Sequence, residues 1–414
     1  MTQRFRIHDP LLFGLAVVAT ILGLALIFDA GYVHSIQKGE SGIPSEFKNQ
    51  LIFIPIAATL SWFAARWPIE KWKKWSKLIW LVNLVLLVAV ALIGHRLNGA
   101  RRWLGFGALS IQPAEFAKLA LVIYFAGCFA DRKTWLQIYK DNKAKANLKN
   151  KLKRALPAVW VALAVVLIEI EPDLGTGAVV AATAFAMFYP GGVSVRSTLI
   201  ALLIAVVGGA YAVYKQPYRL ERFVDHPNRW AKENKDDSQF QTDQAEWTIA
   251  YGGWTGVGLG EGYAKQVLPE TMTDFILATA AEETGLVGAL FLLMLMGAIV
   301  MRLFMKAMAS PDRFSMLILY GVACWLGVQT CVNVMMANAL LPAIGIPFPF
   351  ISYGGSSLVA LWIAMGVCQS ALAPRKIVEQ PETAAESDRP KKKPSKKRRE
   401  EAPVLVGTLR ARGR

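Results

Sequence analysis

Four carboxylates lie close together in residues 267–288, which read VLPETMTDFILATAAEETGLVG. Glu270 and Asp274 lie in a polar stretch, whereas Glu282 and Glu283 lie within the apolar run that follows it. A carboxylate in or beside hydrocarbon is costly, so it usually has a charged partner or a function. We therefore expect the chemistry of this protein to involve this segment.

Asp274 allows two interpretations. The spacing from Thr271 to Asp274 is similar to that of a capping box, which predicts a helix start with an acid in its first turn. Alternatively, Asp274 is a carboxylate at the membrane boundary, where it can accept a proton as a general base. Both interpretations stay open at this point.

Glu282 and Glu283 lie two to three helical turns after Asp274. At about 100° per residue, Glu282 lies nearer the face of Asp274, and Glu283 points nearly opposite. The two carboxylates therefore need separate partners. We interpret both as structural support through contacts with neighbouring segments, in preference to direct catalysis.

A second cluster lies in residues 98–118, NGARRWLGFGALSIQPAEFAK. Pro113 is typical of the first position of a helix, which places Glu115 in the first turn. Lys118 follows Glu115 by three residues, so the two can form an ion pair that lowers the cost of both charges. Arg101 and Arg102 precede this helix, and they predict either an anionic ligand such as pyrophosphate or contact with lipid headgroups.

Two further segments carry polar groups. The acidic run 169–176, EIEPDLGT, can hold a divalent cation, but Asp173 as the N-cap of the next helix is the interpretation that we favour. Gln329 and Asn333 lie in an apolar run, and the Pro- and Gly-interrupted stretch 341–357 follows them. Such irregular backbone at membrane depth predicts a cavity lining.

Composition and periodicity set the fold class. The chain has 414 residues, of which 54% are hydrophobic, and apolar runs long enough to span a bilayer recur along it. This pattern predicts an all-α integral membrane protein with about ten transmembrane helices. The runs are centred on residues 11–28, 51–67, 78–94, 113–130, 156–170, 175–189, 198–214, 275–301, 316–336 and 353–372.

The distribution of Lys and Arg predicts the orientation. Basic residues concentrate in residues 71–77, in residues 132–154 and in the C-terminal tail, and ten helices with both termini in the cytoplasm place all three inside. The large loop 215–273, between the seventh and eighth helices, is then extracytoplasmic. We divide the chain into a membrane domain, residues 1–373, and a disordered basic cytoplasmic tail, residues 374–414. The formal charge of +16 is thus mainly a topology signal, and no nucleic-acid partner is expected.

Several motifs in order resemble one family. The motifs are NGARRW (98–103), IQPAEFAK (111–118), EPDLGT (171–176), YRLERF (218–223), FQTDQA (240–245), GVGLG (256–260), LPETMTDFI (268–276), AEETG (281–285) and PFPFISYGGSS (347–357). They cover nearly the whole membrane domain. The chain resembles the SEDS proteins, the FtsW/RodA/SpoVE family of peptidoglycan polymerases.

The resemblance implies a peptidoglycan glycosyltransferase that joins lipid II units into glycan strands at the outer leaflet of the bacterial cytoplasmic membrane. It implies Asp274 as the catalytic residue, a class B penicillin-binding protein and other divisome proteins as partners, and undecaprenyl-pyrophosphate-linked glycan as a ligand. A divalent cation, Mg²⁺ or Mn²⁺, can assist, although its ligands are not identified. Together with the residue patterns, it gives these candidate substrate-binding residues: Arg101, Arg102, Glu115, Lys118, Gln244, Lys265, Gln329, Asn333, Ser352 and Ser356. Glu282, Glu283 and Asp173 are candidates for structural support.

The chain also departs from the family pattern. Ala245 follows Gln244 where relatives often have serine, and residues 225–238 form a charge-rich insertion. The NGARRW motif and the basic tail are closer to the FtsW branch, which predicts septal synthesis. The alternatives are an elongation-type, RodA-like polymerase, a lipid II translocase, and a scaffold that is active only with its partner.

Overall fold

The computed structural model describes residues 7–37, 39, 42–97, 100–105, 110–131, 148–226 and 237–374. The chain divides into two units, Met1–Ala373 and Pro374–Arg414. Apart from Pro374, the predicted basic tail lies outside the described residues. Most of the predicted basic segment 132–154 also lies outside them, as do Asn98 and Gly99 of the NGARRW motif and most of the insertion 225–238.

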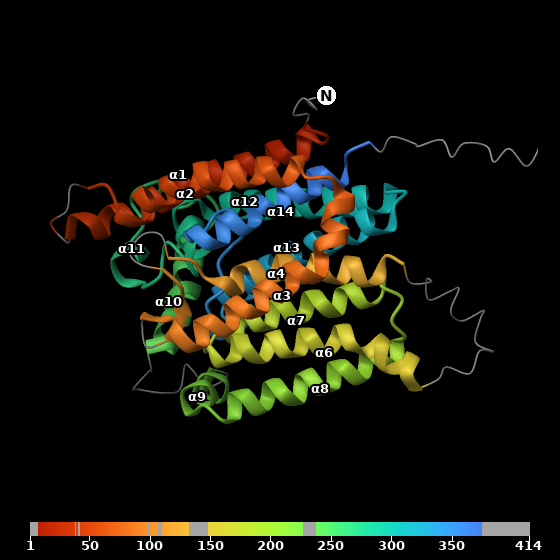
Figure 1. Cartoon of the computed structure of the whole chain (residues 1–414). Helices are drawn as coiled ribbons and strands as arrows, with labels where there is room; N and C mark the ends of the chain where they lie inside the picture. The colour runs from red at the N-terminus through yellow and green to blue at the C-terminus, as the bar shows by residue number, and fades with distance from the viewer. Residues whose placement is uncertain are drawn as a thin grey trace, which may run out of the picture. The chain divides into compact units, whose positions relative to one another are not determined.

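Each of the ten apolar runs forms a helix, and the helices run roughly alongside one another (Figure 1). A helix satisfies most of its backbone hydrogen bonds within its own segment, as a membrane interior requires. The helices are α1 (Pro10–Gln37), α2 (Ser45–Arg66), α3 (Ile69–Ile93), α4 (Pro113–Phe129), α6 (Leu148–Ile170), α7 (Leu174–Phe188), α8 (Val195–Tyr214), α12 (Ile276–Ala309), α13 (Arg313–Ala337) and α14 (Gly355–Ala371).

Five of these helices, α1, α3, α8, α12 and α13, are long and apolar enough to cross a membrane, and α6, α7 and α14 carry shorter apolar stretches. The number of crossings and the side on which each terminus lies stay predictions. The described residues are mostly helical but not entirely so. A short antiparallel hairpin joins β1 (His95–Leu97) and β2 (Ala100–Trp103).

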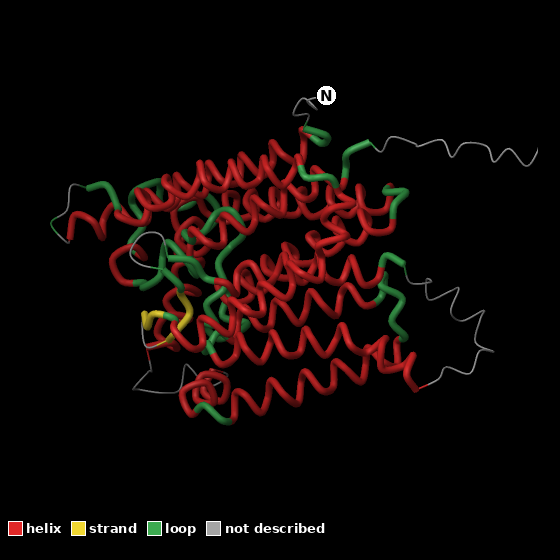
Figure 2. The backbone as a smooth tube through the Cα atoms, in the orientation of Figure 1, coloured by secondary structure: helices red, strands yellow, loops and turns green. Residues whose placement is uncertain are grey.

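The predicted outer loop 215–273 contains three helices of its own, which are α9 (Pro217–Asp225), α10 (Asp237–Gly252) and α11 (Ala264–Val267). These helices lie at one end of the bundle (Figure 1), and the β-hairpin lies at the same end (Figure 2).

Close helix packing builds the core. The pairs α2 with α14, α12 with α13 and α3 with α4 lie side by side. Gly366 of α14 illustrates why small residues occur at such contacts, because a Cβ there would overlap the carbonyl oxygen of Ser61 in α2. By contrast, α8 has no buried residue, which suits a helix surrounded by lipid.

Charged groups join α1 to the far end of α12. Asp9 Oδ1 accepts a hydrogen bond from the Leu12 N–H at 3.0 Å, and its Oδ2 lies 3.0 Å from Arg302 Nε and 3.3 Å from Lys306 Nζ. Gln369 Oε1 accepts from the Asp9 N–H at 2.9 Å. Burial raises the pKa of Asp9, but the Leu12 N–H and the two cations outweigh burial and set the pKa below its ordinary value.

Helix α12 is kinked at Gly285, where φ is 68° and ψ is −171°. The glycine-rich turn after α10 fills the break, because the Val257 N–H donates to the Glu282 carbonyl at 3.0 Å and the Leu286 N–H donates to Gly253 at 2.9 Å. A Cβ at Gly285 would overlap the backbone nitrogen of Gly256. Glycine is required here for both its positive φ and its small size.

Candidate active site

A cavity of about 530 Å³ lies where α4, α7, α12 and α14 begin. Its walls come from segments far apart in the sequence, and many of the lining side chains are polar. The sequence-predicted residues in the lining are Asp274, Arg102, Glu115, Asp173 and Ser356. Asn49, Gln112, Glu270, Thr273, Tyr353 and Ser357 also line it.

The backbone around Asp274 is held by hydrogen bonds from other segments. Asn333 of α13 donates from Nδ2 to the Asp274 carbonyl at 2.9 Å. Ser352 Oγ donates to the Thr273 carbonyl at 2.5 Å, and the Tyr353 N–H donates to the Met272 carbonyl at 2.8 Å. Asn333 and Ser352, predicted as substrate-binding residues, therefore contact the backbone that carries Asp274.

The capping-box interpretation of Asp274 is wrong. Helix α12 begins at Ile276 with Phe275 as its N-cap residue, and its first turn contains no acid. The preceding turn is closed instead by the Glu270 carbonyl, which accepts from the N–H groups of Thr273 at 3.1 Å and Phe275 at 3.2 Å. Asp274 thus lies before the helix, in the lining of the cavity.

Arg102 is oriented by the turn between α6 and α7. Its Nε donates to the Glu171 carbonyl at 3.1 Å, and a terminal nitrogen donates to the Pro172 carbonyl. Neighbouring side chains on a strand point to opposite faces. Arg101 accordingly is exposed and lies outside the cavity lining, whereas Arg102 is part of it.

Glu171 is 1% exposed, and neither of its carboxylate oxygens has a hydrogen-bond partner among the described residues. Burial and the neighbouring Asp173 carboxylate raise the pKa of Glu171 to about 8, although the Arg102 charge opposes this shift. The structure therefore favours a neutral Glu171 below that pH. Sequence analysis did not single out this residue, because its burial depends on distant segments.

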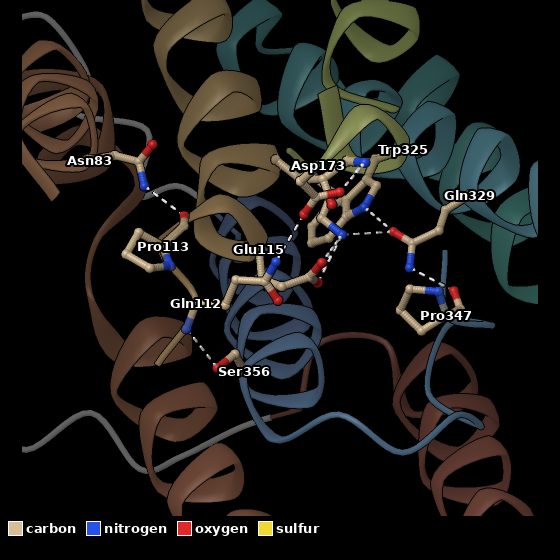
Figure 3. A network of polar contacts seen from close by, with 11 residues as sticks. Asn83, Gln112, Pro113, Glu115, Asp173, Trp325, Gln329, Pro347 and Ser356 are labelled. Carbon is tan, nitrogen blue, oxygen red and sulfur yellow. Dashed lines mark hydrogen bonds and ion pairs between the residues drawn. The ribbon is translucent and has the colours of Figure 1, made fainter. Parts of the chain in front are cut away.

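Asp173 has two hydrogen-bonding roles. Its Oδ1 accepts from the Thr176 N–H at 3.0 Å, so the N-cap interpretation is confirmed. Its Oδ2 accepts from Gln112 Nε2 at 2.9 Å (Figure 3). The Gln112 N–H in turn donates to Ser356 Oγ at 3.0 Å, which joins the starts of α4, α7 and α14.

The predicted ion pair between Glu115 and Lys118 is confirmed. Lys118 Nζ lies 2.7 and 2.8 Å from the two Glu115 oxygens and 3.1 Å from Gln329 Oε1. Gln329 also accepts from Trp325 Nε1 at 2.7 Å and donates to the Pro347 carbonyl at 2.9 Å. Glu115 reaches the cavity, whereas Lys118, only 1% exposed, lies outside the lining.

The remaining predicted residues lie elsewhere. Gln244 in α10 and Lys265 in α11 are outside the cavity lining, and Lys265 is 4% exposed. Glu282 and Glu283 are both buried, but they do not point to opposite sides as predicted: Glu282 accepts from the Ala264 N–H and Glu283 pairs with the neighbouring Lys265. Their function stays a prediction.

Several cavity residues were missed by sequence reasoning. Asn49 lies in an apolar helix, and Tyr353 and Ser357 lie in the stretch whose role as a cavity lining was expected. Within the described part of the chain, no three His, Cys, Asp or Glu side chains are grouped to hold a metal ion. The divalent cation therefore stays a prediction.

These features define a multi-pass membrane protein with a polar, carboxylate-bearing cavity at one end of its helix bundle. Residues 9–376 match the family model FTSW_RODA_SPOVE, described as "Cell cycle protein". The chain belongs to this family, the SEDS proteins.

Named relatives agree with this assignment. The chain is 32% identical over 371 residues to stage V sporulation protein E of Bacillus subtilis (strain 168). This alignment covers 89% of the chain and 97% of the relative. It is 35% identical over 357 residues to the probable peptidoglycan glycosyltransferase FtsW of Coxiella burnetii (strain RSA 493 / Nine Mile phase I), with 84% and 92% covered.

Solved structures have the same fold. One solved structure matches with a TM-score of 0.71 at 27% identity, and the match covers 88% of this chain and 97% of that chain. It is described as "Structural coordination of polymerization and crosslinking by a peptidoglycan synthase complex". The Thermus thermophilus rod shape determining protein RodA matches with a TM-score of 0.63 at 25% identity, covering 88% and 96%.

Proposed function

We propose that this peptidoglycan glycosyltransferase polymerises lipid II at the outer face of the bacterial cytoplasmic membrane, with Asp274 as general base. The observation that carries the proposal is the presence of Asp274 and Arg102 in the lining of one cavity. A carboxylate and a guanidinium in one site suit a reaction that removes a proton and releases a pyrophosphate.

The step balances with these groups. A sugar hydroxyl of one glycan unit attacks the anomeric carbon of another, and the bond from that carbon to the pyrophosphate oxygen breaks. The Asp274 carboxylate accepts the hydroxyl proton, and undecaprenyl pyrophosphate leaves with the bonding electrons. Arg102 uses two of its five N–H donors on backbone carbonyls, so others can face the leaving phosphate.

We further propose that the chain works at the division septum with a class B penicillin-binding protein and other divisome proteins. Support comes from the relatives named FtsW, and from the similarity to a peptidoglycan synthase complex whose description couples polymerization with crosslinking. Rescue of a bacterium depleted of its division-type or its elongation-type polymerase tests the branch. Rescue of the elongation defect alone would overturn the septal assignment.

The polymerase proposal is tested with purified protein, alone and with its penicillin-binding partner, by gel analysis of glycan chains made from labelled lipid II. Asp274→Asn is expected to lower the polymerisation rate by about 10²–10⁴-fold, the usual contribution of a general base. Asp131→Asn is the matched control, because Asp131 forms an exposed ion pair with Lys73 away from the cavity.

Polymerisation by Asp274→Asn at the wild-type rate would overturn the role of Asp274. A lipid II flipping assay in vesicles separates the translocase alternative. If Asp274→Asn abolished flipping while polymerisation continued at the wild-type rate, Asp274 would serve translocation, and its assignment as the base of polymerisation would be wrong.

A further inference from the structure

Asp274 lies midway along a segment, residues 263–283, whose two ends are fastened to each other. Glu282 accepts hydrogen bonds from the N–H groups of Tyr263 at 3.0 Å and Ala264 at 2.9 Å. Lys265 forms an ion pair with Glu283 next to these bonds. We call this group of contacts the clasp. It closes a loop in which Asp274 lies eleven residues after the first residue and nine before the last.

Lys265 also connects the clasp to α1. Its Nζ lies 2.6 Å from Asp29 Oδ2, and its side chain is 1% exposed. The Glu283 side chain is fully buried. One ammonium group, from α11, therefore lies between carboxylates from α1 and α12.

The middle of the segment is held separately. Asn333, Ser352 and Tyr353 hydrogen-bond to the backbone carbonyls of residues 272–274, as described above. These bonds fix one point of the segment, and the clasp fixes where the chain enters and leaves. Asp274 belongs to the middle contacts, and the chain runs from it to the clasp at Glu282 and Glu283, so both sets of contacts bear on the position of its carboxylate.

We propose that Lys265 is a positioning residue for Asp274, acting through Asp29 and Glu283 without touching substrate. The proposal rests on the polymerase function proposed above. It replaces the sequence-based prediction that Lys265 binds substrate, because the buried ammonium lies outside the cavity lining. It also gives α1 a role in the site, although α1 contributes no residue to the cavity lining in the described part of the chain.

Charge explains how the clasp acts. Without the ammonium, the partly exposed Asp29 carboxylate and the fully buried Glu283 carboxylate face each other with no cation between them, and like charges repel. Relief of that repulsion separates α1 from α12 and loosens the ends of the segment. Arginine at position 265 keeps the charge and changes only the shape, so it separates the electrostatic role from packing.

The kinetic test compares Lys265→Met, Lys265→Arg and the control Lys215→Met. Lys215 is exposed at the end of α8, so its replacement makes the same chemical change without a buried charge. We expect Lys265→Met to lower kcat at least tenfold per folded molecule, with KM for lipid II within twofold. Lys265→Arg is expected to have a kcat at least threefold higher than that of Lys265→Met. Lys215→Met is expected to have the wild-type kcat.

Two kinetic results would overturn the proposal. A raised KM with unchanged kcat would make Lys265 a substrate-binding residue. A lower melting temperature with unchanged kcat per folded molecule would limit Lys265 to folding stability.

A distance measurement tests the clasp independently of activity. Nitroxide labels at Ile36→Cys and Leu259→Cys, both exposed positions, report the separation of α1 from the loop beside α11 after the four native cysteines are replaced by alanine. We expect Lys265→Met to broaden the distance distribution, and Asp274→Asn to leave it unchanged. An unchanged distribution in Lys265→Met would overturn the clasp. If the wild-type protein made no glycan while the distribution still broadened, the polymerase proposal alone would fail.

Discussion

The ion pair beneath the cavity should be strongly coupled, and its strength can be worked out from the structure. Both oxygens of Glu115 lie within 2.8 Å of Lys118 Nζ, and the two side chains are only 5% and 2% exposed. Lys118→Met removes the ammonium and leaves the Glu115 carboxylate buried without its cation. Loss of one member of a buried pair typically costs about 3–5 kcal/mol.

Removal of both charges should cost much less. In Glu115→Gln with Lys118→Met no buried charge is left, and the main loss is the contact from Lys118 to Gln329 at 3.1 Å. A hydrogen bond of this kind contributes about 1 kcal/mol. Each single variant leaves an unpaired charge and costs about 3–5 kcal/mol, whereas the double variant costs about 1 kcal/mol, so we expect the double variant to be more stable than either single variant, with a coupling energy of about 5 kcal/mol or more.

The assay is reversible unfolding in mixed micelles as the fraction of denaturing detergent increases, followed by circular dichroism. Lys215→Met serves as the control for replacing lysine by methionine at an exposed site. The reasoning would be refuted if the double variant lost the sum of the two single losses to within about 0.5 kcal/mol, because additivity at that level marks independent sites.

Three further predictions concern stability. Because the pKa of Glu171 is raised to about 8, the folded state holds a proton that the unfolded state releases, and the free energy of unfolding should fall as the pH rises from about 4.5 to 8. Glu171→Gln should make the melting temperature less dependent on pH over this range. Asp9→Ala should lower the free energy of unfolding by about 1–2 kcal/mol at pH 7, because it removes the cap and the ion pairs of α1. This difference from wild type should shrink in acid, as the pH falls through the lowered pKa of Asp9. Gly285→Ala should lower the free energy of unfolding by about 1–3 kcal/mol, because alanine is strained at a φ of 68° and its Cβ would overlap Gly256. Proteolysis at the kink should become faster.

Features that depend on neighbouring residues in the sequence could be predicted. Apolar runs gave the helices, since membrane helices satisfy their hydrogen bonds internally. Pro113, the pair of Glu115 with Lys118, and the cap at Asp173 each involve residues within three positions of one another. Such geometry is set by the helix itself, so the spacing was sufficient.

Features that depend on tertiary contacts could not be predicted. The partners of Lys265 and Arg102 lie on other segments, and no spacing in the sequence identifies them. The kink at Gly285 arises because a loop inserts its own hydrogen bonds into α12. The prediction of a helix cap at Thr271 was wrong for a related reason. The chain makes a turn, closed by the Glu270 carbonyl, before α12 begins.

The charged contacts of α1 and α12 explain how a membrane bundle accommodates buried ions. Asp9 pairs with Arg302 at one end, and Asp29 meets Glu283 through Lys265 at the other. About 20 residues separate the two contacts on each helix, which is roughly 30 Å of helix and close to the thickness of the hydrocarbon core. This spacing is the one expected for ions that lie near the two interfaces, where desolvation is least costly. Because α12 is joined to α1 near both of its ends, the start of α12 beside Asp274 is fixed both along the axis of α1 and in its orientation relative to α1.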